Sequence, residues 1–115
     1  METKRYCLTL DLVDDPELIA LYRRLHSPEE IWPEIPAGIR EVGVTAMDIY
    51  LDGTRLFMIT EMPASINYDE AMVRLATLPR QAEWEETVGR CQLCELGSTS
   101  AGKWRLMEQI FRLPD

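Results

Sequence analysis

Two strand-length segments rich in apolar and β-branched residues flank an Asp-Gly pair, and this arrangement constrains the fold more than any other feature. The segments are residues 44–51 and 55–62, with Asp52-Gly53 between them. Both segments are predicted as strands, and Asp-Gly is a strong short-range hairpin signal. Pro63 ends the second segment because proline has no N–H for the sheet ladder. The centre of the chain is therefore predicted to be an antiparallel hairpin.

Strand and helix patterns lie on either side of this hairpin. Residues 6–12 alternate as a half-buried strand, and Asp14-Asp15-Pro16-Glu17 then provides a helix start with an acidic cap and an early proline. The helix that follows ends at Ser27-Pro28. Further segments are predicted as helices at residues 32–41 (with a stop at Gly43), 67–78 and 81–93, a flexible loop at 97–102, and a closing strand at 104–113.

The order of these elements predicts an α+β fold. A β-α-β-β-α-β series is the ferredoxin-like arrangement, a four-stranded antiparallel sheet with helices on one face. The 115 residues are expected to form a single domain, residues 1–115. Along the predicted strands, one set of alternate positions holds Leu, Met, Ile and Phe, and the other set includes Asp48, Tyr50 and Thr60. Neither face of the sheet is therefore expected to be wholly polar. We therefore expect two sheets to face each other in a homodimer, with a semi-polar cavity in each subunit.

Charge and hydropathy exclude some classes of partner. The net charge is −8 and no basic stripe is present, so nucleic-acid binding is not expected, whereas a neutral small molecule is compatible. The longest apolar runs are only strand-length, so no membrane span is expected. The N-terminus leads directly into a strand pattern without a secretory signal, which predicts a cytoplasmic location.

The three cysteines have little predicted chemistry. Cys91-Gln92-Leu93-Cys94 has the spacing of a redox pair or of half a zinc site, but the second pair of zinc ligands is missing. The favoured interpretation is two small residues near a helix end, with Cys7 also a reduced thiol. No glycine-rich phosphate loop occurs, so no nucleotide, flavin, metal or other cofactor is predicted.

His26 is the only histidine, and it follows Tyr22 by one helical turn. Side chains four apart share a helix face, so the phenol and the imidazole are expected to enter the same space. Imidazole can give and take a proton near neutrality, which predicts an acid/base site. Glu34 could orient the imidazole. The competing interpretation is a surface histidine or a satisfied core group.

Three tryptophans are candidates for contacts with a sugar, because aromatic faces stack on apolar C–H surfaces. Plain core packing is the alternative for each of Trp32, Trp84 and Trp104. Trp104 is expected in the core at the start of the last strand. Trp84 has acidic neighbours and is the better candidate for a pocket wall; these neighbours are Glu83, Glu85 and Glu86.

These motifs together resemble the L-rhamnose mutarotase family over nearly the whole chain. The resemblance rests on residues 22–26, Ile31-Trp32-Pro33-Glu34, residues 48–51 and residues 55–58. It implies a dimeric ferredoxin-like barrel that interconverts the α and β anomers of a 6-deoxyhexose without a cofactor. It also implies that His26 is the proton donor, that Tyr22 binds the sugar, and that a late tryptophan pair lines the pocket.

Two positions depart from the family pattern. Met47 stands where the family has its second binding tyrosine, and Glu83 replaces the first tryptophan of the pair, which leaves Trp84. The chain is more similar to the branch associated with L-fucose, so the expected substrate is L-fucose or L-rhamnose.

The resulting hypothesis gives His26 the proton of the ring oxygen, with Tyr22, Trp32, Met47 and Trp84 around the sugar. The second proton acceptor stays open, and the candidates are Asp48, Tyr50, Glu34 or a water molecule. Two other functions remain open: a cofactor-free monooxygenase of the same fold, or a non-catalytic sugar-binding or dimerisation module.

Overall fold

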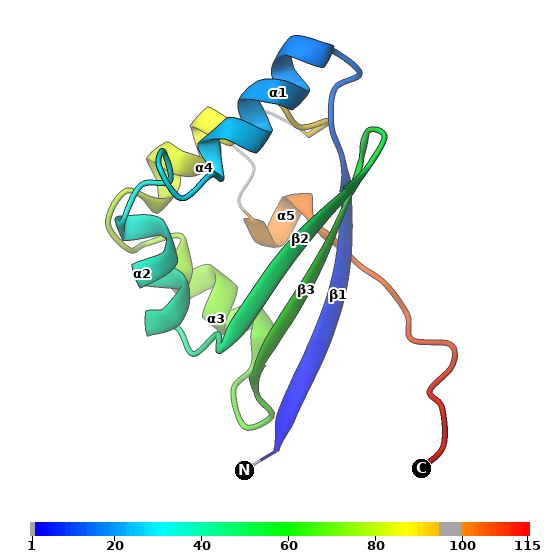
Figure 1. The fold of residues 1–115 in the computed structure, drawn as a ribbon. Coiled ribbons are helices and arrows are strands. Elements are labelled where there is room, and N and C mark those ends of the chain that lie inside the picture. The colour runs from blue at the N-terminus through cyan, green and yellow to red at the C-terminus, as the bar shows by residue number, and fades with distance from the viewer. Residues whose placement is uncertain (1, 95–99) are drawn as a thin grey trace.

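A twisted four-stranded sheet carries all of the helices on one face (Figure 1). The computed structural model describes residues 2–94 and 100–115. The elements in chain order are β1 (Thr3–Asp11), α1 (Pro16–Leu25), α2 (Glu34–Glu41), β2 (Ala46–Asp52), β3 (Arg55–Pro63), α3 (Tyr68–Leu75), α4 (Gln81–Gly89), α5 (Ser100–Lys103) and β4 (Arg105–Leu106).

The sheet has the strand order β2-β3-β1-β4, and all three neighbouring pairs are antiparallel. This is the order of the predicted ferredoxin-like fold, which is therefore confirmed. β3 pairs along its whole length with β1, from Thr3 opposite Pro63 to Asp11 opposite Arg55. The predicted hairpin between β2 and β3 is also confirmed, with Asp52 opposite Arg55 at its turn.

The helix boundaries follow the capping signals of the sequence. The Asp15 carboxylate accepts a hydrogen bond from the Glu17 N–H at 2.9 Å, so the predicted acidic cap of α1 is confirmed. α2 begins at Glu34, two residues later than expected, and the predicted stop follows it. Gly43 has φ 107°, a left-handed conformation that favours glycine.

Two clusters of buried apolar residues fill the space between the helices and the sheet. The first joins β1 and β3 to α1, α2 and α4; it contains Leu10, Leu12, Tyr22, Ile35, Leu56, Trp84, Val88 and Cys91. The second packs α3 against the end of α2 and β3; it contains Val42, Val44, Met62, Ala71, Met72 and Leu75. Both clusters position helices that carry side chains of the candidate site.

The expected division of side chains between the two sheet faces is wrong in part. Residues directly opposite each other in a ladder project from the same face. Met47 lies opposite Thr60, which is fully buried beneath the helices, so Thr60 belongs to the helix-covered face. Asp48 lies opposite Ile59 and Tyr50 opposite Phe57, so the open face mixes apolar and polar groups.

The last third of the chain departs most from the prediction. α4 ends at Gly89 rather than at residue 93, because the following segment bonds to the end of β1: the Leu93 N–H donates to the Asp11 carbonyl at 2.9 Å. The predicted loop at 97–102 lies partly outside the described residues, and α5 begins at Ser100. The closing strand shortens to Arg105–Leu106, and the rest of the C-terminal segment leaves the sheet (Figure 1).

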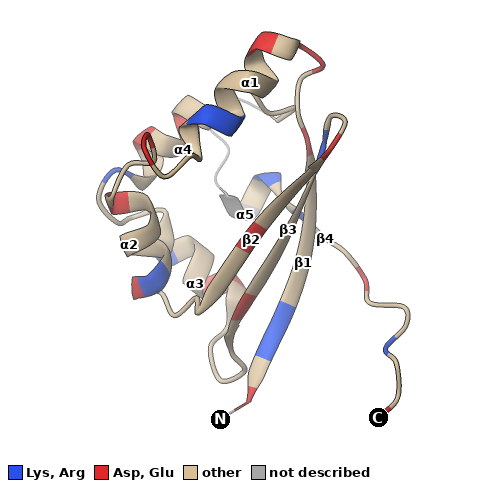
Figure 2. Cartoon of the chain, viewed as in Figure 1, with Lys and Arg blue, Asp and Glu red and all other residues tan. Residues whose placement is uncertain are grey.

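Charged residues are distributed over several elements. Figure 2 shows acidic and basic positions interspersed on the helices and strands, with no continuous basic stripe in this view. In the described part of the chain, no helix has the length and apolar character that crossing a membrane requires.

Candidate active site

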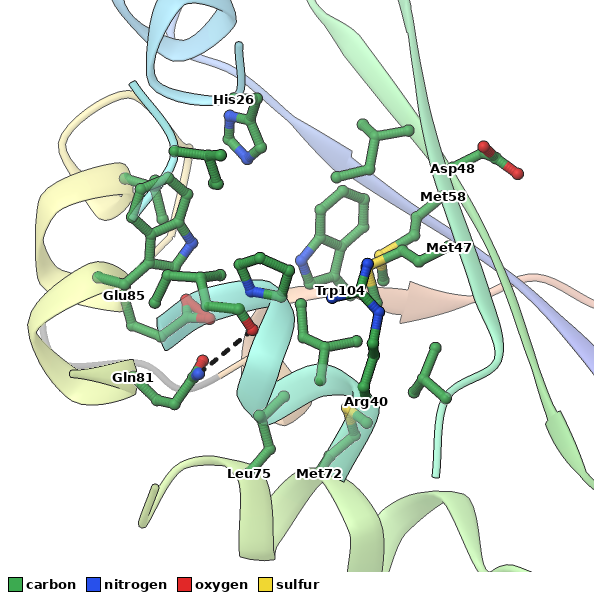
Figure 3. Close-up of a pocket in the computed structure, with 18 of the residues that line it drawn as sticks. His26, Arg40, Met47, Asp48, Met58, Met72, Leu75, Gln81, Glu85 and Trp104 are labelled. Carbon is green, nitrogen blue, oxygen red and sulfur yellow. Dashed lines mark hydrogen bonds between the residues drawn. The ribbon is translucent and has the colours of Figure 1, made fainter. Parts of the chain in front are cut away.

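A cavity of about 500 Å³ lies between the helices and the helix-covered face of the sheet. Side chains from α1, α2, β2, β3, α3 and α4 line it, and Trp104 closes it from the C-terminal part of the chain (Figure 3). This volume is within the usual range for small-molecule sites, which is about 300–1,000 Å³. The helices and the sheet of one chain form these walls.

His26 enters this cavity from the end of α1, as the sequence predicted. Its Nδ1 lies 2.7 Å from the backbone carbonyl oxygen of Tyr22. Because a carbonyl oxygen only accepts, Nδ1 carries the proton and donates it, which leaves Nε2 for the cavity. Burial lowers the pKa of His26 below 6.5, opposed by the bond to Tyr22 and by the negative charge of Glu85. The imidazole is therefore mainly neutral at pH 7.

Tyr22 lies beside His26 as predicted, with ring centroids 4.3 Å apart and ring planes tilted by 35°. The side chain is buried, and its hydroxyl oxygen accepts a hydrogen bond from Gln92 Nε2 at 3.4 Å. Burial raises the pKa of the phenol above its ordinary value of 10.0, so the hydroxyl keeps its proton. Tyr22 can thus donate a hydrogen bond to a ligand oxygen.

The tryptophans have different positions relative to the cavity. Trp84 lines it and meets His26 edge to face, with centroids 5.2 Å apart. Trp32 contacts Trp84 at 5.1 Å but is not among the residues that line the cavity. Its ring instead lies 3.9 Å from the guanidinium of Arg80. Trp104 both packs on the first core cluster and lines the cavity, although it stands before β4 rather than within a long strand.

Glu34 is directed to Arg80 rather than to His26. Its carboxylate oxygen Oε1 lies 3.6 Å from Arg80, which also binds Glu83 at 3.0 Å. Arg80 itself has φ 62°, a left-handed conformation that is uncommon outside glycine. The predicted Glu34–His26 pair therefore has no counterpart among the described contacts.

The candidates on β2 divide between the two sheet faces. Met47 projects into the cavity, opposite the buried Thr60. Asp48 contributes to the wall, but its carboxylate points away from the other labelled side chains (Figure 3). Tyr50 is 59% exposed on the open face and is not among the lining residues. Successive side chains of a strand point to opposite faces, so the side chains of Asp48 and Tyr50 are directed away from His26.

The sequence reasoning missed a carboxylate that lies in the cavity wall. Glu85 lines the cavity, and its Oε2 lies 2.8 Å from Lys103 Nζ. The same ammonium donates to the Glu85 backbone carbonyl at 3.0 Å. A helical spacing of residues 81, 84, 85 and 88 places Gln81, Trp84, Glu85 and Val88 on one face of α4, and this signal could have identified Glu85.

Gln92 is a second missed residue. It is buried, it lines the cavity, and its Nε2 holds the Tyr22 hydroxyl. Its Oε1 is buried without a hydrogen-bond partner among the described residues. Within residues 2–94 and 100–115, no group of three or more His, Cys, Asp or Glu side chains could hold a metal ion.

Comparisons with known proteins agree with this fold and identify the family. The family model described as L-rhamnose mutarotase matches residues 5–113. An L-fucose mutarotase from Xanthomonas campestris pv. campestris is 39% identical over 117 residues, which cover 100% of this chain and 92% of that protein. A UPF0734 protein from Dictyostelium discoideum is 31% identical over 104 residues, which cover 88% and 82%.

A solved structure has the same fold. The crystal structure of an L-rhamnose mutarotase from Formosa agariphila matches with a TM-score of 0.71 and 17% identity, covering 96% of this chain and 99% of that one. Fold, cavity and sequence similarity together define a sugar mutarotase, which is an isomerase. The chain belongs to the L-rhamnose mutarotase family, as the motifs around Tyr22 and His26 predicted.

Proposed function

We propose that this protein interconverts the α and β anomers of a 6-deoxyhexose, L-fucose or L-rhamnose, by opening and closing the pyranose ring. The observation that carries the proposal is the orientation of His26, whose Nε2 faces a cavity while Nδ1 is held by the Tyr22 carbonyl. The names of the L-fucose and L-rhamnose mutarotases quoted above support this substrate class.

The side chains around His26 have complementary roles in this proposal. The Tyr22 hydroxyl donates a hydrogen bond to a sugar hydroxyl, and its high pKa keeps that donor protonated. Trp84 provides an apolar wall for the C–H face of the ring. Met47 provides a thioether, which cannot donate a hydrogen bond, so this part of the wall accommodates an apolar edge of the sugar.

His26 handles the proton of the ring oxygen. Ring opening breaks the bond between C1 and the ring oxygen while that oxygen gains a proton, and the anomeric hydroxyl loses one. Rotation about the C1–C2 bond and closure on the other face complete the exchange. Placed acid/base groups contribute about 10²–10⁴-fold to such proton transfers.

Anomer exchange measured by saturation-transfer NMR tests the proposal directly. We expect the native protein to accelerate exchange of L-fucose, L-rhamnose or both, and His26→Asn to lose at least about 10²-fold of that rate. Arg23→Gln, a change at an exposed position of the same helix, is the matched control. Equal exchange by the native protein and His26→Asn would remove His26 from the mechanism, and sugar binding without any acceleration would favour a non-catalytic binding module.

We further propose a homodimer that covers the open face of the sheet. Phe57 and Ile59 on this face lie beside Tyr50, which is 59% exposed. The C-terminal segment adds Ile110 and Phe111, which are 88% and 71% exposed. A second copy of the chain offers the same apolar surface, so the two faces are self-complementary. Light scattering should give twice the chain mass, and Phe111→Asp should shift it toward the monomer, whereas Glu108→Gln should not.

A cytoplasmic location is part of the same proposal. Cys7, Cys91 and Cys94 are all free thiols, which supports a reducing compartment. Fractionation of cells that express the untagged protein tests this location.

A further inference from the structure

We propose that Glu85 is the second acid/base group of the site, the one that accepts the proton of the anomeric hydroxyl while His26 serves the ring oxygen. This inference rests on the proposed function and extends it to a residue that neither the motifs nor the comparisons identify. It also assigns a positioning role to Lys103, whose buried ammonium holds the Glu85 carboxylate.

The position of Glu85 supports this role. Its side chain enters the cavity from α4, whereas His26 enters from the end of α1, so the two groups approach the same space from different helices (Figure 3). The carboxylate is only 17% exposed. A carboxylate held at this depth has little contact with bulk water and is placed to contact a ligand in the cavity.

The other carboxylates fit the role less well. Among the described residues that line the cavity, Asp48 and Glu85 carry carboxylates. The Asp48 carboxylate points away from the other labelled side chains in Figure 3. This agrees with its ladder partner Ile59, which lies on the open face of the sheet. Glu34 is paired with Arg80 and is absent from the cavity wall. Glu85 is therefore the carboxylate placed to share a ligand with His26.

Lys103 makes this placement possible. An ionised carboxylate is costly to bury unless a partner compensates its charge. The Lys103 side chain is 1% exposed, and its ammonium donates both to Glu85 Oε2 at 2.8 Å and to the Glu85 backbone carbonyl at 3.0 Å. Two contacts to one residue fix the side chain relative to its own backbone. The ion pair thereby compensates the charge of the Glu85 carboxylate and orients it.

The proton balance of the reaction closes with these two groups. In ring opening, His26 in its protonated form, which is the minor form at pH 7, gives its Nε2 proton to the ring oxygen as the bond from that oxygen to C1 breaks. Glu85 takes the proton of the anomeric hydroxyl, which becomes the aldehyde oxygen. After rotation about C1–C2, the hydroxyl of C5 returns its proton to His26 and Glu85 returns the other to the aldehyde oxygen. Both groups end in their starting states.

The pKa of His26 depends on the charge of Glu85, so the proposed pairing of these two residues can be measured. Glu85 raises the pKa of His26, whereas burial, the larger effect, lowers it. The other ionisable side chains that line the cavity among the described residues are Tyr22 on α1, Arg40 on α2, Asp48 on β2 and Tyr68 on α3. Lys103 on α5 is paired with Glu85. Replacing Glu85 by a neutral group removes the negative charge and should lower the pKa of His26 further.

Two variants test the proposal. Glu85→Gln keeps the shape of the side chain and removes the acceptor charge, but it leaves Lys103 buried and unpaired. The double variant Glu85→Gln/Lys103→Met removes both charges, so it does not carry the energetic cost of a buried, unpaired ammonium. Glu86→Gln, an exposed neighbour on the same helix, is the matched control. Exchange of both sugars is measured by saturation-transfer NMR, and because His26 is the only histidine, its ring signals can be titrated without ambiguity.

We expect kcat to fall at least about 10²-fold in both Glu85 variants with a smaller change in KM, and the His26 pKa to fall in Glu85→Gln. Recovery of native kcat in the double variant would overturn the proposal, because Glu85 would then serve only to pair with Lys103. Native kcat in Glu85→Gln would overturn it as well. If Glu85→Gln does not fold, the double variant decides. Absence of exchange by the native protein would instead refute the proposed function itself.

Discussion

Gly38 of α2 lies against the Gln81 side chain of α4, and replacing it with alanine should destabilise the protein. A Cβ at this position would lie 2.4 Å from Gln81 Nε2, 3.3 Å from Gln81 Cδ and 3.4 Å from Leu75 Cδ1. Real Cβ atoms are essentially never found within 3.0 Å of such a neighbour, so the Gln81 amide has to move. That amide is buried, and it donates to the Glu34 carbonyl at 2.9 Å and to the Ile35 carbonyl at 3.4 Å.

The magnitude follows from two opposing effects. Alanine in a helix interior is about 0.5–1 kcal/mol more favourable than glycine. Displacing the Gln81 amide leaves a buried donor unsatisfied, which costs about 1–3 kcal/mol. The second effect is larger, so Gly38→Ala should lower the free energy of unfolding by about 1 kcal/mol. In a Gln81→Ala background the obstacle is gone, and the same substitution should raise the free energy of unfolding by about 0.5–1 kcal/mol.

Urea unfolding of the four proteins in this cycle, followed by circular dichroism, measures both signs. We expect Gly38→Ala to lower the free energy of unfolding in the native background and to raise it in the Gln81→Ala background. Helix propensity alone would raise it in both backgrounds. A Gly38→Ala protein more stable than the native chain would refute the close contact between Gly38 and Gln81. Equal effects in the two backgrounds would refute it too.

Four further predictions concern the site. Lys103→Met should lower the free energy of unfolding by about 3–5 kcal/mol in urea titrations, because it leaves Glu85 buried without its ammonium, and a change below 1 kcal/mol would contradict this pairing. Tyr22→Phe should raise KM for the sugar with a smaller effect on kcat in saturation-transfer NMR, because it removes a donor to a ligand hydroxyl. Unfolding free energy should fall as the pH drops below 6.5, because the unfolded chain then binds a proton at His26 that the native state, with its lowered pKa, does not; His26→Asn should lack this part of the pH dependence between pH 6.5 and the native pKa. In contrast, kcat should rise as the pH falls from 8 toward the His26 pKa, because imidazolium is the proton donor.

The sheet and the placement of Tyr22 beside His26 could be predicted because local signals determine them. Asp52-Gly53 sets the hairpin, Asp15 sets the start of α1, and the four-residue spacing of Tyr22 and His26 places their rings together. Each signal acts within a few residues and needs no knowledge of distant parts of the chain. The direction in which Nδ1 of His26 bonds also follows locally, because its partner is the carbonyl one turn earlier.

The C-terminal part could not be predicted because its conformation depends on distant partners. The apolar residues at 106–113 indicate a surface that needs cover, but the pattern does not state which surface covers it. In the structure only Arg105 and Leu106 find ladder partners, at Thr9 and Leu8 of β1. α4 ends early for a related reason, since the segment after Gly89 bonds to the end of β1, about eighty positions away in the chain.

The composition of the cavity depends on the same kind of long-range contact. His26 and Tyr22 come from one helix, yet the groups proposed to complement them come from residues 85, 92 and 103. Gln92 reaches the Tyr22 hydroxyl across seventy positions of sequence, and Lys103 reaches Glu85 across eighteen. On the proposed mechanism, a substitution at Lys103 would therefore alter the proposed His26–Glu85 pair without touching the motif around Tyr22 and His26. We expect His26 and Glu85 to carry the reaction, whereas Met47 in the cavity wall is expected to affect which sugar is bound.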